Sequence, residues 1–187
     1  RNLIGGTAPG ARNLISGNGL AGVAISGDFE HTFISVASFN VVQGNLIGTD
    51  VTGTAPIGNV YGVWLDRGAE DNLIGGTTPE ARNVISGNGN GVNISGGARN
   101  LVQGNLIGTD IHGTAALGNS TGVSLDGVGD TVGGTTAGAG NVISGNFTGV
   151  SMSSNNNRLQ GNRIGVGVTG TPLGNSQHGV WVVRSNN

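Results

Sequence analysis

The chain has 187 residues, of which 39 are glycine and 23 are asparagine, so these two residue types make up a third of the sequence. Only 10% of residues are charged, the formal net charge is −2, lysine and cysteine are absent, and the eight basic residues are all arginine. Without cysteine there is no disulfide scaffold and no thiolate metal site, and without a basic cluster nucleic acid is not an expected partner. No apolar run approaches the roughly 18 residues of a membrane-spanning helix.

Three long internal repeats fill the chain. The segment Asn-Leu-Ile-Gly-Gly starts at Asn2 and at Asn72, and a weaker copy, Asp-Thr-Val-Gly-Gly, starts at Asp130. Each copy is followed by an Asn-x-apolar-Ser-Gly-Asn segment and later by a Gln-Gly-Asn segment. We therefore interpret the chain as a single domain with repeats at 1–70, 71–129 and 130–187, and we expect it to be one stretch of a longer array.

Short strands are expected in the same order within each unit of the array. The first strand has an inward apolar residue at Ile4, the second at Ile15, and the third, which begins with a Gly-Val pair, at Val23 and Ile25. Copies of these positions stay apolar along the chain. The residues between them in the third strand vary among polar, small and aromatic types, and the residue before the inward position of the first two strands admits threonine or arginine. This period of two is typical of a strand with one buried face, so the variable residues are expected to point outward.

Six Gly-Val pairs mark six units, with valine-to-valine steps of 40, 29, 31, 27 and 30 residues. No segment carries an i, i+3, i+4, i+7 apolar pattern over ten or more residues, so helices are not expected. Strands this short form no core alone, but stacked coils do when each strand pairs in parallel with its equivalent one turn along. The pattern predicts an all-β parallel solenoid of about six coils of roughly 29 residues.

Asparagine recurs at the corners between the expected strands. An Asn side chain tolerates left-handed backbone, and its amide can donate to and accept from the same position in the next coil. We therefore predict two ladders of stacked asparagines. One contains Asn18, Asn88 and Asn146, and the other contains Asn45, Asn105 and Asn162.

The repeated strings resemble a known family. Asn-x-Ile-Gly-Gly, Ala-Arg-Asn-x-Ile-Ser-Gly-Asn, Gly-Asn-Leu-Ile-Gly-Thr-Asp and Gly-Asn-x-x-Gly-Val are similar to the right-handed parallel β-helix repeats of large bacterial surface and secreted proteins. That fold is shared with pectin lyase-like enzymes and phage tailspikes. The resemblance covers the chain except residues 28–39, and it implies a right-handed β-helix at an extracellular or cell-surface location. It implies little about function, because such repeats occur in adhesins, stalks, lyases and hydrolases.

Two Gly-Thr-Asp loops are the most regular polar feature outside the strands. Asp50 and Asp110 hold the same place in these loops, and each could bind Ca²⁺ together with nearby carbonyl oxygens. The two residues are predicted to lie two coils apart, roughly 9.6 Å along the axis, which is too far to share one ion. The alternative is that each aspartate bonds to the backbone of its own loop. No other cofactor is expected.

Residues 28–39 interrupt the repeat. The insertion has twelve residues where the matching link at 97–99 has three, and it contains three of the four phenylalanines. Asp28, Glu30 and His31 lie in its first four residues, so the segment is a candidate ligand-binding loop. The alternative is a short β-excursion whose phenylalanines pack on the flank of the solenoid.

Trp64 lies in the outward column of the third strand, where an exposed indole could stack on a sugar ring. Packing against a loop or a neighbouring domain is the alternative. Asp66 and Asp126 hold equivalent outward places two coils apart, at the outer limit for a pair of glycosidase carboxylates. No histidine position recurs beside them. We therefore assign no catalytic residue.

The sequence as a whole favours a non-catalytic structural or adhesive segment of a larger bacterial extracellular protein. Its expected partners are flanking coils of the parent protein, or a second copy bound end to end. The alternative is a polysaccharide-binding or polysaccharide-cleaving domain, of lyase or hydrolase type.

Overall fold

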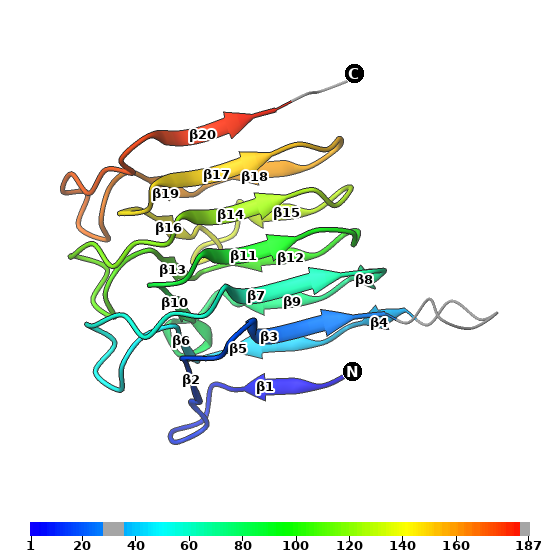
Figure 1. The fold of residues 1–187 in the computed structure, drawn as a ribbon, viewed down its shortest axis with the longest axis horizontal. Helices are drawn as coiled ribbons and strands as arrows, with labels where there is room; N and C mark the ends of the chain where they lie inside the picture. Colours follow the sequence, from blue (N-terminus) through cyan, green and yellow to red (C-terminus); the bar gives the residue numbers. More distant parts are fainter. Residues whose placement is uncertain (28–35, 184–187) are drawn as a thin grey trace.

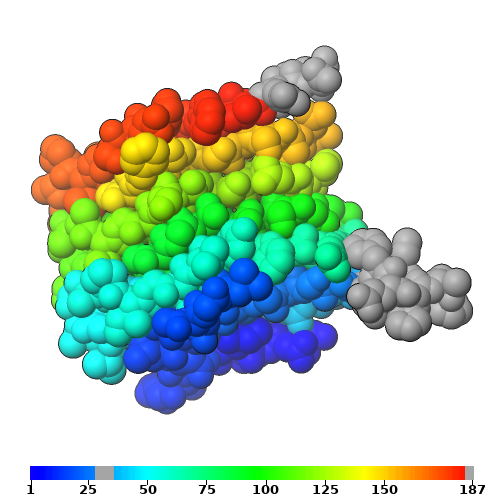
Figure 2. Space-filling view, viewed as in Figure 1, coloured from blue at the N-terminus to red at the C-terminus, as the bar shows by residue number. Residues whose placement is uncertain are grey.

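The computed structural model describes residues 1–27 and 36–183. The chain winds as a right-handed parallel β-helix, in which successive turns lie on one another from the N-terminus to the C-terminus (Figure 1). The space-filling view shows these turns as successive layers in sequence order (Figure 2). The fold predicted from the repeats is confirmed, and within the described residues the only helical element is the 3-10 turn η1 (Pro79–Ala81).

Three six-stranded sheets form the walls of the solenoid, and all of their strand pairings are parallel. The first sheet contains β1 (Leu3–Gly5), β5 (Val41–Gln43), β9 (Leu73–Gly75), β12 (Leu101–Gln103), β15 (Thr131–Gly133) and β18 (Arg158–Gln160). The second contains β2 (Leu14–Ile15), β6 (Leu46–Ile47), β10 (Val84–Ile85), β13 (Leu106–Ile107), β16 (Val142–Ile143) and β19 (Arg163–Ile164). The third contains β3 (Ala21–Ser26), β7 (Tyr61–Asp66), β11 (Asn90–Ile94), β14 (Thr121–Leu125), β17 (Thr148–Met152) and β20 (His178–Val182).

Each coil consists of three strands, one from each sheet, so that coil 1 is β1-β2-β3 and coil 6 is β18-β19-β20. Loops of two kinds alternate along the stack. Coils 1, 3 and 5 carry a loop between the first and second sheets, at 6–12, 76–82 and 134–140, which we name the first-corner loops. Coils 2, 4 and 6 carry a loop between the second and third sheets, at 49–56, 109–116 and 166–172, which we name the second-corner loops.

The inward side chains of the three sheets meet in one continuous core. Leu65, Ile94 and Leu125 are paired neighbours on β7, β11 and β14, and each is 0% exposed. At the last coil the column opens, because Val180 and Val182 of β20 are 43% and 59% exposed. The alternation in the sequence therefore identified the buried face of these strands correctly.

A second, smaller apolar cluster lies outside the coil, on the outer face of the second sheet. Its four members are Leu46, Val84, Leu106 and Val142, which are all at most 4% exposed. Their side chains point away from the main core, as the alternation requires, but Ile111 and Val168 from the second-corner loops pack over them. The prediction that residues in this column point outward is confirmed, but the column is not exposed to solvent, because the second-corner loops cover it.

A short two-stranded sheet extends one corner of the helix. β4 (Ala37–Ser38) pairs in parallel with β8 (Ala69–Glu70). β4 belongs to the insertion at 28–39, of which residues 28–35 lie outside the described residues. Phe39 follows β4 and is 60% exposed. Within the described residues, no helix is long and apolar enough to cross a membrane.

Candidate functional site

Asparagine side chains form three ladders that run along the corners of the helix. The ladder before the first sheet contains Asn2, Asn40, Asn72, Asn100, Asp130 and Asn157. The ladder before the second sheet contains Asn13, Asn45, Asn83, Asn105, Asn141 and Asn162. The ladder before the third sheet contains Asn18, Asn59, Asn88, Asn119, Asn146 and Asn175.

The inner asparagine rungs bond in the same way, as Asn105 illustrates. Its backbone N–H and its Nδ2 both donate to Oδ1 of Asn141, at 2.9 and 3.0 Å. Nδ2 also donates to the carbonyl oxygen of Ile74 in the preceding coil, at 2.9 Å. Its own Oδ1 accepts from the backbone N–H and the Nδ2 of Asn83. Because every rung donates to the Oδ1 of the following rung, the ladder has a direction.

The predicted ladders are confirmed, but their members are not direct neighbours. Asn18 donates to Asn59, and it is Asn59 that donates to Asn88. The repeats that align in the sequence are two coils long, and so they identify only every second rung. The whole ladder before the first sheet was missed as well.

We expect Asn105→Ala to lower the free energy of unfolding by about 1–3 kcal/mol, because Asn83 and Asn141 lose their partner inside a buried corner. Urea unfolding followed by circular dichroism measures the change. Asn93→Ala is the matched control, because the buried Oδ1 of Asn93 on β11 accepts no hydrogen bond from the described residues. Equal losses in the two variants would mean that asparagine is selected for its backbone conformation and not for the ladder.

Asp130 replaces asparagine in one rung. It is 0% exposed, and its Oδ1 accepts from the backbone N–H and the Nδ2 of Asn100, at 2.8 and 3.1 Å. Its Oδ2 is buried without a hydrogen-bond partner among the described residues. In the preceding rung, Nδ2 of Asn100 donates to the carbonyl oxygen of Ala69 in the coil before it. Burial raises the pKa of Asp130, and the bonds from Asn100 oppose that rise only in part.

We expect Asp130→Asn to stabilise the chain at neutral pH by about 1–3 kcal/mol, since it supplies the missing amide donor and removes a buried acid. The folded pKa of Asp130 lies above its unfolded value, so the wild-type loses stability as pH rises from the unfolded pKa through the folded one. The gain should therefore be smaller at about pH 3 than at about pH 7. Urea unfolding of both proteins across this range tests it, and a gain independent of pH would contradict the assignment.

The carboxylates of the Gly-Thr-Asp loops bond within their own loops. Asp50 Oδ2 accepts from the Thr52 hydroxyl at 2.6 Å, and its Oδ1 accepts from the backbone N–H of Thr54 and of Ala55. These bonds, that from Thr52 first, lower the pKa of Asp50 to about 2. Asp110 Oδ1 accepts the two equivalent backbone bonds in its loop.

The second-corner loops touch one another even though a coil without such a loop separates their coils. Ile111 N–H donates to the carbonyl oxygen of Gly53 at 2.9 Å. Among the described residues, no group of three or more acidic, histidine or cysteine side chains is placed to hold a metal. The hypothesis of Ca²⁺ at Asp50 or Asp110 stays a prediction.

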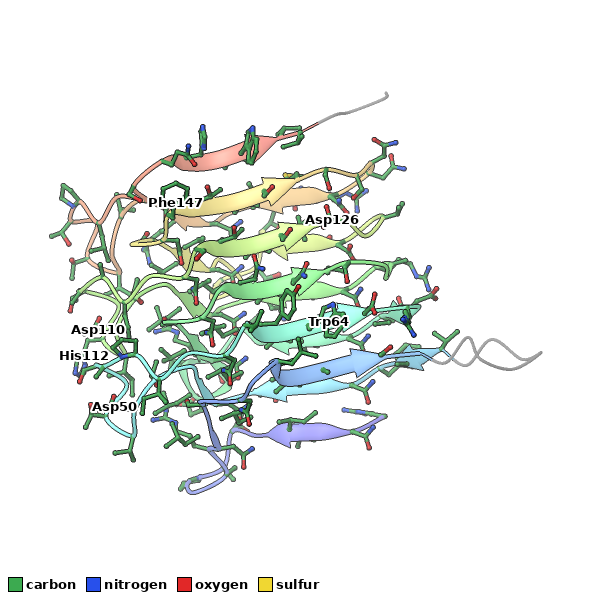
Figure 3. All side chains as sticks on the ribbon, viewed as in Figure 1. Asp50, Trp64, Asp110, His112, Asp126 and Phe147 are labelled. Carbon is green, nitrogen blue, oxygen red and sulfur yellow. The ribbon has the colours of Figure 1, made fainter. Side chains whose placement is uncertain are left out.

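Trp64 is stacked on Tyr61 on the outer face of the third sheet, with ring centroids 5.2 Å apart and an angle of 22° between the rings. Its Nε1 donates to Oγ of Ser95 at 2.8 Å, and that hydroxyl donates to Asp66 Oδ1 at 3.1 Å. Asp126 bonds instead to Ser153 in the next coil. Trp64 on β7 and Asp126 directly after β14 lie well apart from the loops that carry Asp50, Asp110 and His112 (Figure 3).

The other predicted ligand contacts, Asp28, Glu30 and His31, lie outside the described residues. At the corner beside the insertion, Arg99 pairs with Glu70 and Asp71 at 2.6 and 2.9 Å. The bond from Arg99 lowers the pKa of Asp71. All three side chains sit on links between the third and first sheets, so they connect neighbouring coils at an exposed corner.

No family model, curated protein or solved structure matches the chain.

Proposed function

We propose that the chain is a non-catalytic structural or adhesive segment of a larger bacterial extracellular protein, similar to the pectin lyase-like β-helices in fold. The observation that carries this proposal is the direction of the three ladders, which makes the two ends of the segment complementary. The bacterial and extracellular origin rests on the resemblance of the repeat strings alone.

The first coil offers hydrogen-bond acceptors to a preceding coil. Oδ1 of Asn2, Asn13 and Asn18 occupies the place in which inner rungs accept two bonds, and no donor from a described residue reaches it. The last coil offers donors, because Asn162 and Asn175 present backbone N–H groups that inner rungs pair with the following Oδ1. Coils of matching register, from the parent protein or from a second copy, would therefore extend all the ladders.

Binding of a polysaccharide is the second candidate, and the aromatic pairs on the third sheet favour it. Tyr61 with Trp64, and His178 with Trp181, are stacked at centroid distances of 5.2 and 5.5 Å. The strands between them carry the partly exposed polar residues Asn90, Thr121, Ser124 and Ser151, whereas Asn93 and Thr148 are buried. Four coils separate the two tryptophans, about 19 Å at the usual strand spacing, so each would hold a different sugar ring.

A panel of neutral and acidic polysaccharides, tested for both binding and cleavage, distinguishes the two functions. The structural proposal expects no cleavage and no saturable binding to the third sheet. The Trp64→Ala and Trp181→Ala variants identify that face, with Phe147→Ala as the control for an exposed aromatic outside the two stacks. Saturable binding that both tryptophan variants lose, and that the control keeps, would replace the structural proposal with the polysaccharide-binding one.

A further inference from the structure

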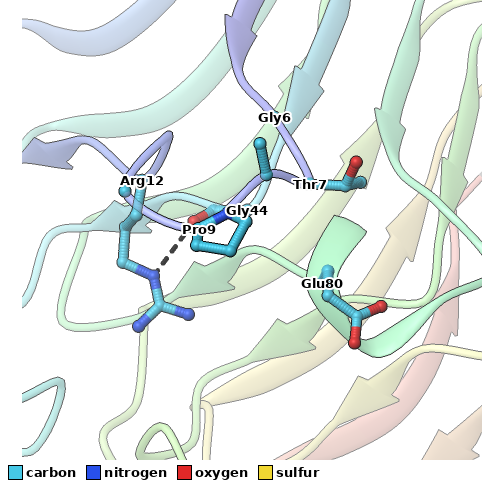
Figure 4. Close-up of a pocket in the computed structure, with 8 residues that line it drawn as sticks. Gly6, Thr7, Pro9, Arg12, Gly44 and Glu80 are labelled. Atoms are coloured by element: carbon cyan, nitrogen blue, oxygen red, sulfur yellow. Dashed lines mark hydrogen bonds between the residues drawn. The ribbon is translucent and has the colours of Figure 1, made fainter.

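Two cavities flank the first-corner loops on the outside of the solenoid. The first, of about 390 Å³, is lined by residues 6–10 together with Arg12, Gly44 and Glu80 (Figure 4). The second, of about 530 Å³, is lined by residues of the third loop, 134–140, together with Arg82, Gly161 and Arg163. The two cavities are built from equivalent loops, but they differ in charge.

The difference follows from the loop sequences, Thr-Ala-Pro-Gly-Ala-Arg-Asn, Thr-Thr-Pro-Glu-Ala-Arg-Asn and Thr-Thr-Ala-Gly-Ala-Gly-Asn. Arg12 shares the first cavity with Glu80, whereas Arg82 shares the second with Gly138, which holds the place of Glu80 in its own loop. Gly140 holds the place of the two arginines, so the third loop brings no arginine of its own to the second cavity, and Arg163 of β19 lines it instead. Among the described residues, no acidic side chain lines the second cavity.

The arginine side chains of the second cavity keep hydrogen-bond donors that are available to a ligand. Arg82 Nε donates to the carbonyl oxygen of Gly104 at 3.1 Å, which fixes the guanidinium and leaves its Nη atoms available to bind. Arg163 projects from β19, and Thr135 and Thr136 also line the space. The ion pairs found among the described residues involve Arg67 and Arg99, not the arginines of this cavity.

We propose that the cavity between Arg82 and Arg163 binds an oxyanion, either free sulfate or phosphate or a sulfate ester carried by a sugar. Guanidinium groups donate in a planar fork that matches the oxygens of such groups, and hydroxyl donors complete the shell. The chain as a whole carries a formal net charge of −2, so the attraction is local to these two side chains. The site is independent of the proposed structural role, because it lies on the outer surface and uses no ladder residue.

The test is a titration of the full chain with sodium sulfate and with sodium phosphate, followed by NMR shifts of the backbone amides at 134–140. A second arm compares glucose 6-sulfate with glucose. We expect the anions, but not glucose, to shift the amides of Thr135, Thr136 and Gly138, and we expect added chloride salt to weaken the effect. Tighter binding of glucose 6-sulfate than of sulfate would identify an ester as the ligand, and equal binding would identify the free anion.

Variants locate the site. Arg163→Gln and Arg82→Gln should each weaken binding about tenfold, since each removes charge-assisted hydrogen bonds. Arg12→Gln, in the cavity that contains Glu80, should leave it unchanged. The Arg82→Gln variant loses the bond to Gly104 and could therefore unfold the chain. Arg163 is exposed, so Arg163→Gln tests the site in either case. Absence of any shift, or equal weakening by the Arg12 and Arg163 variants, overturns the proposal.

Discussion

Replacing Ile94 with aspartate should prevent the chain from folding. Ile94 is 0% exposed and lies between Leu65 and Leu125, which are paired with it on the two neighbouring strands. A carboxylate in this column has no partner, and burying an unpaired charge costs several kcal/mol, which is comparable with the whole stability of a domain. Circular dichroism and thermal unfolding of the purified variant measure the outcome.

Ser124→Asp is the matched control, because it introduces the same side chain one strand away on the outer face. Ser124 pairs with Asn93 and Ser151 on β11 and β17, and all three side chains leave the core. We expect this variant to keep the melting temperature of the wild-type within a few degrees. If both variants melted alike, the assigned facing of the third sheet would be wrong.

The inward columns could be predicted because six copies of the same strand vary on one side only. Val63, Val92 and Val123 remain valine while Trp64, Asn93 and Ser124 beside them differ, and each of the valines is 0% exposed. A side chain that repeats in every coil must fit between identical neighbours, so its column tolerates little change. The outer face carries no such restriction.

The alternate rungs of the ladders could not be predicted in this way. Asn59 follows a second-corner loop, whereas Asn18 and Asn88 follow a short Ser-Gly link. The two corner sequences share little beyond asparagine and glycine, so comparing long repeats aligned only corners of one kind. Their equivalence appears only when the coils are stacked and Asn59 receives the bond from Asn18.

Leu46 shows a different limit. Alternation places its side chain outside the coil, but alternation contains no information on what covers that surface. Ile111 and Val168 come from the second-corner loops, which lie outside the alternating pattern of the strands, and they pack over the column. The burial of Asp130 could not be predicted either, because only the stacking of the rungs shows that this acid is 0% exposed.

The second-corner loops also predict how two molecules would meet. Ile111 packs against Gly53, where an added Cβ would lie 2.8 Å from Cβ of Ile111, and Val168 packs in the same way against Gly113. Each loop therefore has an apolar residue that fits the glycine of the loop before it. At the ends of this series Val51 is 76% exposed, and no atom of the described residues lies within 4 Å of the Cβ position of Gly170.

We expect the purified 187-residue chain to associate head to tail, with coil 1 of one molecule on coil 6 of the next. Second-corner loops occur on coils 2, 4 and 6, so this arrangement places Val51 of one molecule over Gly170 of the other in the same register. It also pairs the ladder acceptors of the first coil with the donors of the last and covers the exposed Val180. A contact between unlike ends does not close on itself, so it should propagate into longer species.

Sedimentation velocity over a range of protein concentrations measures this association. Val51→Asp should weaken it by at least about tenfold, because a carboxylate would face the loop glycine and lose its water on contact. Val128→Asp is the control, since Val128 is 50% exposed at a corner in the middle of the stack and takes no part in either end. Equal association of the two variants would mean that the loops do not form the contact. A monomer at every concentration would mean that the complementary ends do not suffice to hold two copies together, because ordering two end faces costs more than their ladders and apolar columns return.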